Sequence, residues 1–141
     1  MPPRPHLALP SPASRRAVVV GAGSFGTAVA VLLARGGFRT TLQTRTREQC
    51  QQLDGDRQNA VYLPGVEFPR DLRVEPADNG LGRVDYCFLG VPSVALAGVI
   101  SSLGERGLDR RTPVISLAKG LVPPHGTSPP AAERARPTPA T

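Results

Sequence analysis

The 141-residue sequence predicts an α/β domain built on a doubly wound parallel sheet with helices on both faces. Three observations predict this class. Short apolar runs, typical of strands buried on both faces, alternate with segments of helical periodicity. A glycine-rich turn joins the first apolar run to the first helical segment. Proline gathers at the two ends of the chain, and the alternating pattern between them holds only five of the 16 prolines.

Proline also sets the boundaries of the expected domain, since residues 1–12 hold five prolines and residues 122–141 hold six. Proline-rich polar sequence buries too little apolar surface to offset the loss of chain entropy. Residues 1–14 and 122–141 are therefore expected to be disordered tails, and residues 15–121 to form the domain. The N-terminal tail lacks the apolar stretch of a signal peptide, and the chain lacks a run of about 18 apolar residues, so we expect a soluble protein.

The first half of the domain has the expected order strand, helix, strand, helix. The first strand covers residues 17–20, and the helix after it ends at the glycine pair 36–37. The second strand covers residues 38–43, and the second helix covers residues 47–53. Four apolar side chains at positions i, i+4, i+7 and i+8 form the expected inner face of the first helix: Phe25, Val29, Leu32 and Leu33.

The second half of the domain continues the alternation. Residues 59–71 contain two prolines and a glycine and are expected to form an ordered loop. Further strands are expected at residues 72–74, 84–90 and 112–117. A third helix begins at Pro92, because proline is favoured in the first turn of a helix. Its expected inner face consists of Leu96, Val99, Ile100 and Leu103.

Composition and charge exclude several classes of function. The chain has 17 basic and 11 acidic residues, but the two ends, residues 1–16 and 122–141, contribute +4 of the formal net charge of +6. This distribution argues against a nucleic-acid-binding face on the folded part. The two cysteines, Cys50 and Cys87, have neither the spacing of metal ligands nor that of a disulfide framework. We therefore expect no metal site and a reducing cytoplasm.

The glycine-rich turn has the spacing of a dinucleotide-binding loop. Gly21, Gly23 and Gly26 fit the pattern G-x-G-x-x-G directly after the first strand and at the start of the first helix. In this pattern the first glycine allows the tight turn, the second lets a pyrophosphate approach the backbone, and the third lets the helix pack close to the strand. The helix start adds unpaired N–H groups and a partial positive charge. We therefore expect dinucleotide binding, with a purely structural turn as the alternative.

The end of the second strand indicates which dinucleotide is bound. Domains that bind NAD usually place an Asp or Glu about 20 residues beyond the glycines, on the ribose 2′-hydroxyl. Here Arg45 and Arg47 occupy that region, and no acid precedes Glu48. Arginines hold a 2′-phosphate through forked, charge-assisted hydrogen bonds. NADP(H) is therefore the favoured cofactor and NAD(H) the alternative, in which case both arginines are surface charges that open a helix.

One residue type is nearly absent. The chain has 16 arginines and a single lysine, Lys119, which follows the last expected strand. A lysine carries a compact ammonium that arginine does not replace. Open α/β sheets bind their ligands at the carboxyl ends of the strands. Lys119 is therefore a candidate ligand-binding residue, and chance placement is the alternative.

Five blocks in this order resemble NAD(P)-dependent glycerol-3-phosphate dehydrogenases of the bacterial type: VVVGAGSFGTA, TLQTR, NAVYLPGV, FLGVPS and SLAKGL. The resemblance runs over residues 17–124. It implies a Rossmann fold and a nicotinamide dinucleotide cofactor. It also implies the interconversion of dihydroxyacetone phosphate and sn-glycerol 3-phosphate in the cytoplasm, which supplies a precursor of glycerophospholipids. Full chains of the family continue into a helical substrate domain.

The resemblance implies roles for single residues. Ser24 and Phe25 match cofactor contacts inside the glycine loop. Arg45 matches a contact near the adenosine ribose, and Tyr62 matches a further cofactor contact. Lys119 matches a lysine that reaches both the nicotinamide and the substrate.

The chain departs from the family pattern after Leu121. The general base of the family is a second lysine in the helical domain, whereas Lys119 is the single lysine here. We therefore expect no catalytic residue within the chain and no activity of the chain alone. An early stop or a shifted reading frame is the favoured origin, and a naturally short chain is the alternative. Two other functions stay open: the first domain of another NADP-dependent dehydrogenase, and a non-enzymatic dinucleotide-binding module.

Overall fold

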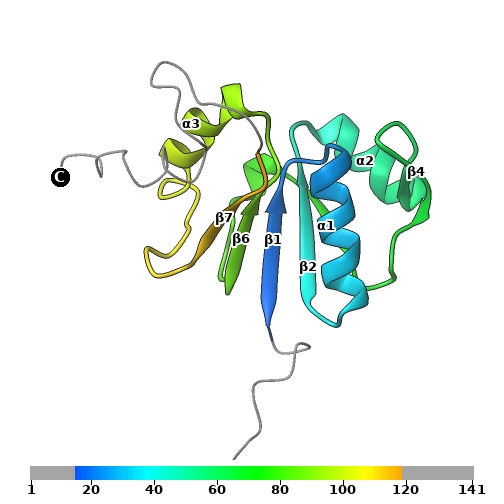
Figure 1. The fold of residues 1–141 in the computed structure, drawn as a ribbon, viewed down its shortest axis with the longest axis horizontal. Helices are drawn as coiled ribbons and strands as arrows, with labels where there is room; N and C mark the ends of the chain where they lie inside the picture. The colour runs from blue at the N-terminus through cyan, green and yellow to red at the C-terminus, as the bar shows by residue number, and fades with distance from the viewer. Residues whose placement is uncertain (1–14, 119–141) are drawn as a thin grey trace, which may run out of the picture.

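A computed structural model describes residues 15–118, and within them a five-stranded sheet forms the centre of the fold. All neighbouring strands in this sheet are parallel, in the order β5-β2-β1-β6-β7 (Figure 1). The strands are β1 (Arg16–Val20), β2 (Arg39–Thr44), β5 (Arg73–Pro76), β6 (Tyr86–Leu89) and β7 (Val114–Ser116). β1 lies in the middle of the sheet. The chain adds β2 and β5 on one side of β1 and then β6 and β7 on the other.

Three α-helices of the described chain cover the two faces of this sheet: α1 (Ser24–Arg35), α2 (Arg47–Asp56) and α3 (Ser93–Ser102). Side chains alternate along β1, so Val19 packs with residues of α1 and α2 in one core cluster, while Val18 and Val20 pack with α3 in the other. Figure 1 shows α1 and α2 on the right of β1 and α3 on the left. The predicted doubly wound α/β fold is confirmed.

The local sequence explains where α2 begins and ends. Thr46 has extended backbone angles, and its Oγ1 accepts a hydrogen bond from the backbone N–H of Gln49 at 3.1 Å. This is an N-cap, which satisfies one of the free donors of the first turn. The helix stops at Arg57, which adopts the left-handed conformation with φ 51°. The guanidinium of Arg57 donates to the carbonyls of Pro69 and Leu72, and these bonds hold the residue there.

The predicted inner face of α1 is wrong for two of its four residues. Phe25 and Leu32 are 53% and 65% exposed, and Val29 and Leu33 only border the core. The residues that α1 buries are smaller and lie one position away on the helical wheel: Gly26, Thr27, Ala30, Val31 and Ala34. The helix packs so close to the sheet that large side chains do not fit between them. The positions of the large apolar residues therefore do not identify the buried face of α1.

The predicted loop over residues 59–71 is also partly wrong. It contains a small antiparallel hairpin formed by β3 (Gln58–Asn59) and β4 (Leu63–Glu67). Pro64 and Gly65 lie inside β4, although these two residue types favour loops and led to the prediction of a loop here. Proline is tolerated there because both strands of a two-stranded sheet are edge strands, and the N–H groups on an outer edge donate no hydrogen bond to another strand.

The two cysteines lie on opposite sides of the sheet. Cys50 borders the core cluster of α1 and α2, whereas Cys87 is buried in the cluster of α3. Neither Cys50 nor Cys87 forms a disulfide. Burial, with a smaller contribution from the negative charge of Asp54, raises the pKa of the Cys50 thiol. Among residues 15–118 no helix is long and apolar enough to cross a membrane, and no three metal-ligating side chains gather.

Candidate functional site

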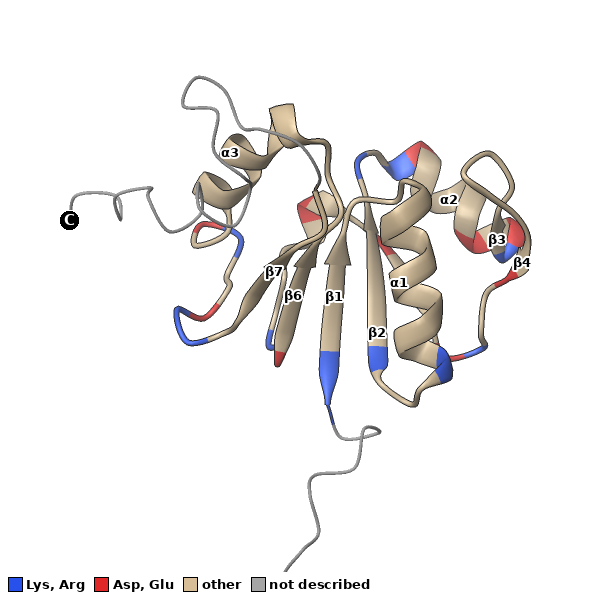
Figure 2. Cartoon of the chain, in the orientation of Figure 1, with Lys and Arg blue, Asp and Glu red and all other residues tan. Residues whose placement is uncertain are grey.

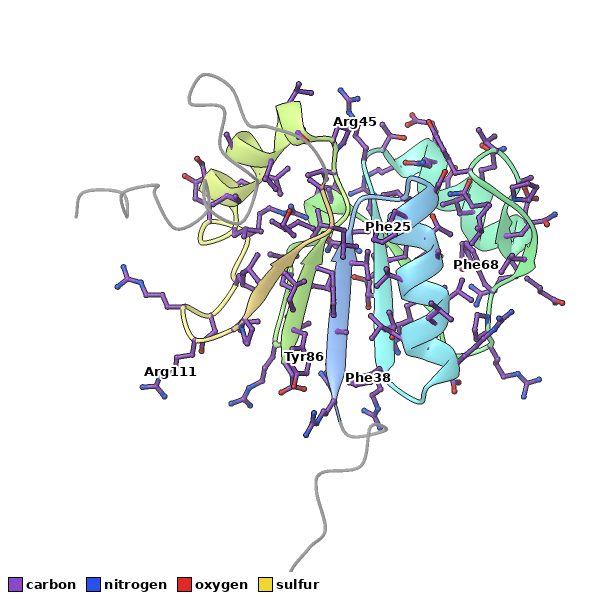
Figure 3. The ribbon with its side chains drawn as sticks, viewed as in Figure 1. Phe25, Phe38, Arg45, Phe68, Tyr86 and Arg111 are labelled. Carbon is purple, nitrogen blue, oxygen red and sulfur yellow. The ribbon has the colours of Figure 1, made fainter. Side chains whose placement is uncertain are left out.

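The candidate site lies at the point where the order of the strands in the sheet changes direction. β2 and β6 flank β1 on opposite sides, so the connections that leave β1 and β6 diverge at the carboxyl edge of the sheet. Open α/β folds bind ligands in the crevice at this point. A groove of about 990 Å³ lies there. Its walls include six of the residues predicted from the sequence: Gly21, Gly23, Ser24, Phe25, Arg45 and Tyr62. Figure 3 shows Phe25 and Arg45 at this edge.

Three glycine backbones, those of Gly21, Gly26 and Gly90, pack against one another beside the groove, and two of them, Gly21 and Gly90, line it. Gly21 has φ 107°, and a Cβ on it would lie 2.5 Å from the carbonyl oxygen of Gly90. A Cβ on Gly26 would collide with the carbonyl oxygen of Gly21, and one on Gly90 would lie 2.9 Å from the Cα of Gly26. The N–H of Gly90 also donates to the carbonyl of Val20 at 2.7 Å. Only glycine fits at these three positions, and the loop is thereby held tight against the start of α1.

Gly23 differs from these three glycines. Its φ of −78° suits any residue, and a Cβ on it would have no neighbour within 4 Å. It is the N-cap of α1, yet no side chain caps this helix and no acid lies in its first turn. The positive end of the helix dipole therefore lies, without a side-chain cap, at the groove that Gly23 and Ser24 line. This arrangement suits a diphosphate group.

Asn59 supports the loop from behind, and the sequence analysis did not single it out. Its side chain is 2% exposed, and its Nδ2 donates to the carbonyl of Ala22 at 2.9 Å and to Thr27 Oγ1 at 3.0 Å. Its Oδ1 accepts from the backbone N–H of Tyr62 at 3.4 Å. Asn59 thus joins the glycine loop, the first turn of α1 and the hairpin that carries Tyr62. The sequence carries no signal for it, because the burial and the partners of Asn59 follow from the tertiary structure.

The two arginines after β2 have different surroundings. Arg47 pairs with Asp78, with its Nη2 2.8 Å and its Nε 2.9 Å from Oδ2. The guanidinium of Arg45 has no such partner among the described residues and is exposed at the end of β2. Figure 2 shows basic and acidic residues side by side where β2 runs into α2. No Asp or Glu is among the described residues that line the groove, whereas Arg45 and Arg106 both line it.

The far end of the groove is formed after β7. The N–H of Leu117 donates to the carbonyl of Leu89 at 2.9 Å, which continues the pairing of β6 with β7. Leu117 and Ala118 line the groove. The predicted ligand-binding residue Lys119 comes next in the sequence and lies outside the described residues. Its role stays a prediction.

The fold and the glycine loop together define a dinucleotide-binding domain of the Rossmann type. The family model described as NAD-dependent glycerol-3-phosphate dehydrogenase N-terminus matches residues 16–133. The chain belongs to this family. The predicted family and the predicted cofactor class, a nicotinamide dinucleotide, are confirmed.

Individual relatives agree with this assignment. The chain is 36% identical over 106 residues to the glycerol-3-phosphate dehydrogenase [NAD(P)+] of Alcanivorax borkumensis, and 38% identical over 104 residues to that of Chlorobium limicola. These matches cover 74% and 73% of this chain and 31% of each relative. The crystal structure of glycerol-3-phosphate dehydrogenase from Coxiella burnetii is similar with a TM-score of 0.72 and 29% identity, over 79% of this chain and 34% of that one. The chain thus spans about a third of the length of its relatives.

Proposed function

We propose that this domain binds NADP(H), and more weakly NAD(H), as the cofactor-binding part of a cytoplasmic glycerol-3-phosphate dehydrogenase. The activity proposed for the whole enzyme is the interconversion of dihydroxyacetone phosphate and sn-glycerol 3-phosphate. The observation that carries the proposal is the groove at the carboxyl edge of the sheet. Gly21 and Gly90 line it, and it contains an uncapped helix start and no carboxylate among its described lining residues.

The groove supports one orientation of the cofactor. The diphosphate lies over Gly23 and the first N–H groups of α1, with Ser24 and Phe25 beside it. The adenosine half extends toward the end of β2, where Arg45 lies. The nicotinamide half extends toward the ends of β6 and β7, where Leu117 and Ala118 line the groove. Lys119, the next residue, is the proposed contact to both the nicotinamide and the substrate.

The chemistry of the bound cofactor is hydride transfer. The residues of this domain contribute binding and orientation. The glycine backbones and the helix start hold the diphosphate, and the largely apolar wall of Val91, Pro92 and Leu117 excludes water from the nicotinamide end. Reduction of a carbonyl also requires a proton donor within hydrogen-bond reach of its oxygen. No Asp, Glu, His or Lys is among the described residues of the groove, so we propose that the donor comes from elsewhere.

Titration of the purified chain with NADPH and with NADH, followed by nicotinamide fluorescence, tests the binding part of this proposal. Saturable binding of both, with NADPH the tighter, is expected. No saturable binding of either dinucleotide would overturn it. A non-enzymatic module would bind in the same way, so the enzymatic part is tested by an activity assay in which the helical domain of a relative is supplied separately.

A further inference from the structure

Arg106 reaches the groove from a part of the chain that the glycine motif does not involve. It follows α3, and its backbone carbonyl accepts a hydrogen bond from the N–H of Leu81 at 2.8 Å. Its partly buried side chain passes over the face of the sheet that α3 covers. There its Nη2 donates to the Oε1 of Gln43, on β2, and to the carbonyl of Ala77 at 3.3 Å. Gln43 is itself fixed, because its Nε2 donates to the carbonyl of Gly80 at 2.6 Å. The guanidinium is therefore held in place before any ligand arrives.

Its position connects two hollows. Arg106 lines the large groove, and it also lines a neighbouring hollow of about 490 Å³. Arg45 and Ala77 are likewise shared by both. The other lining residues of the smaller hollow are Arg47, Glu48, Pro76 and Asp78. A ligand group at the end of β2 therefore lies where both Arg45 and Arg106 line the surface.

The charge of Arg106 is not compensated within the described chain. Its acceptors are an amide oxygen and a carbonyl, both neutral, and its buried Nε has no hydrogen-bond partner. No carboxylate of the described residues pairs with it. Arg47 contrasts with it, because Asp78 already neutralises that guanidinium. A partly buried cation with only neutral acceptors stabilises an anion next to it more than an exposed, paired cation does.

We propose that Arg106 and Arg45 form a phosphate-monoester subsite that takes the 2′-phosphate of NADP(H), and that Arg106 is the residue that sets the preference for NADP(H). This inference rests on the proposed function. Nη1 of Arg106 makes no hydrogen bond to the described residues and is the donor for a phosphate oxygen, and the positive charge of the guanidinium favours a phosphate over a ribose hydroxyl. The neutralised Arg47 contributes little to the preference. The sequence predicts only the arginines after β2 for this site. Arg106 completes it from the segment that follows α3.

The test compares Arg106→Gln with the matched control Arg47→Gln, each titrated with NADPH and NADH. Loss of a charge-assisted hydrogen bond at a partly buried site corresponds to roughly a tenfold weaker affinity or more. Arg106→Gln is expected to weaken NADPH by about that factor while NADH changes by less than about twofold. Arg47→Gln is expected to weaken NADPH by less than about threefold, as for exposed ion pairs. Equal losses for both dinucleotides, or a larger loss in Arg47→Gln, would overturn the inference.

Calorimetry with pieces of the cofactor and with inorganic phosphate distinguishes a site for the 2′-phosphate of NADP(H) from a site for free phosphate. The unsubstituted chain is expected to bind 2′,5′-ADP more tightly than 5′-AMP, and inorganic phosphate weakly. Arg106→Gln is expected to remove the difference between the two nucleotides. Inorganic phosphate binding as tightly as 2′,5′-ADP would show a free-anion site instead and would overturn the assignment to the cofactor.

These outcomes also separate the inference from the function on which it rests. If the unsubstituted chain binds neither dinucleotide, the proposed function is wrong. If it binds both and Arg106→Gln changes neither, only the inference is wrong. Should Arg106→Gln fail to fold, as judged by circular dichroism, a crystal structure of the unsubstituted chain with 2′,5′-ADP decides. A 2′-phosphate oxygen within hydrogen-bond distance of the Arg106 guanidinium is expected, and a phosphate bound only by Arg45 and Arg47 would contradict the inference.

Discussion

The side-chain amide of Asn59 donates a hydrogen bond to Thr27 Oγ1 at 3.0 Å and so ties the β3–β4 hairpin to the first turn of α1. The same nitrogen donates to the carbonyl of Ala22 at 2.9 Å, inside the glycine loop. Both side chains are buried, at 2% and 0% exposure. The loop proposed to hold the diphosphate is thus braced by a segment more than 30 residues away in the chain.

Asn59→Ala is expected to destabilise the domain and to weaken cofactor binding. The substitution leaves the buried carbonyl of Ala22 without its donor, which costs about 1–3 kcal/mol. Urea unfolding measures this loss, and NADPH titration measures the effect on the loop. Asn79→Ala is the matched control, because Asn79 is exposed and should change neither quantity. An Asn59→Ala variant as stable as the control would show that the hydrogen bonds of the Asn59 side chain contribute nothing to the stability of the domain.

Gly23→Val is expected to abolish dinucleotide binding without unfolding the domain. The backbone angles at Gly23 suit valine, and its Cβ would enter open space, so the fold has no reason to change. That space is where the diphosphate is proposed to lie, and a branched side chain there blocks it. The measurement is NADPH fluorescence titration beside circular dichroism.

Gly55→Val is the control for this variant. Gly55 lies in α2, and a Cβ there also meets nothing within 4 Å, but the residue does not line the groove. Unchanged NADPH affinity is expected. If Gly23→Val bound NADPH as tightly as Gly55→Val does, the diphosphate would have to lie elsewhere.

The order of the main elements was predictable because its signals are local. The apolar run before Gly21 and the helical periodicity after it depend on neighbouring residues, and so does the proline that opens α3. The inner face of α1 was not predictable in the same way. How closely a helix approaches a sheet depends on residues distant in the chain, here Gly90 against Gly26. Small residues at that contact displaced the larger apolar stripe to the surface.

The candidate site was predictable only where a motif encodes it. The glycine loop and the arginines after β2 have fixed spacing and were found from the sequence. Asn59 and Arg106 were not, because each acts through contacts with segments 29 to 63 residues away. No periodicity or spacing marks such a residue. The composition of the groove, with two arginines and no acid among its described lining residues, likewise follows only from the tertiary structure.

Arg45→Ala is expected to weaken NADPH binding more than NADH binding. Arg45 lines both hollows at the end of β2 and is exposed, so solvent screens part of its interaction with a 2′-phosphate. The loss for NADPH is therefore expected to be about threefold to tenfold, which is less than a charged hydrogen bond at a buried site contributes. Fluorescence titration of both dinucleotides gives the ratio.

Arg35→Ala serves as the control for Arg45→Ala. Arg35 is an exposed arginine at the last turn of α1 and does not line either hollow. It should leave both affinities unchanged. An equal loss of NADPH and NADH affinity in Arg45→Ala would instead make Arg45 a general contact to the adenosine.

The 141-residue chain alone is expected to show no dehydrogenase activity. Reduction of dihydroxyacetone phosphate needs the substrate held against the nicotinamide and a proton donor at its carbonyl oxygen. No Asp, Glu, His or Lys is among the described residues of the groove, and Lys119 is the one lysine of the sequence. The measurement is NADPH oxidation with dihydroxyacetone phosphate, first with the chain alone and then with the separately expressed helical domain of a relative. Because that domain is proposed to supply the proton donor, activity is expected only in the second mixture, and there it should fall when Lys119→Ala is used. Turnover by the isolated chain at the roughly 10 per second typical of enzymes would contradict this expectation and place a complete active site within these 141 residues.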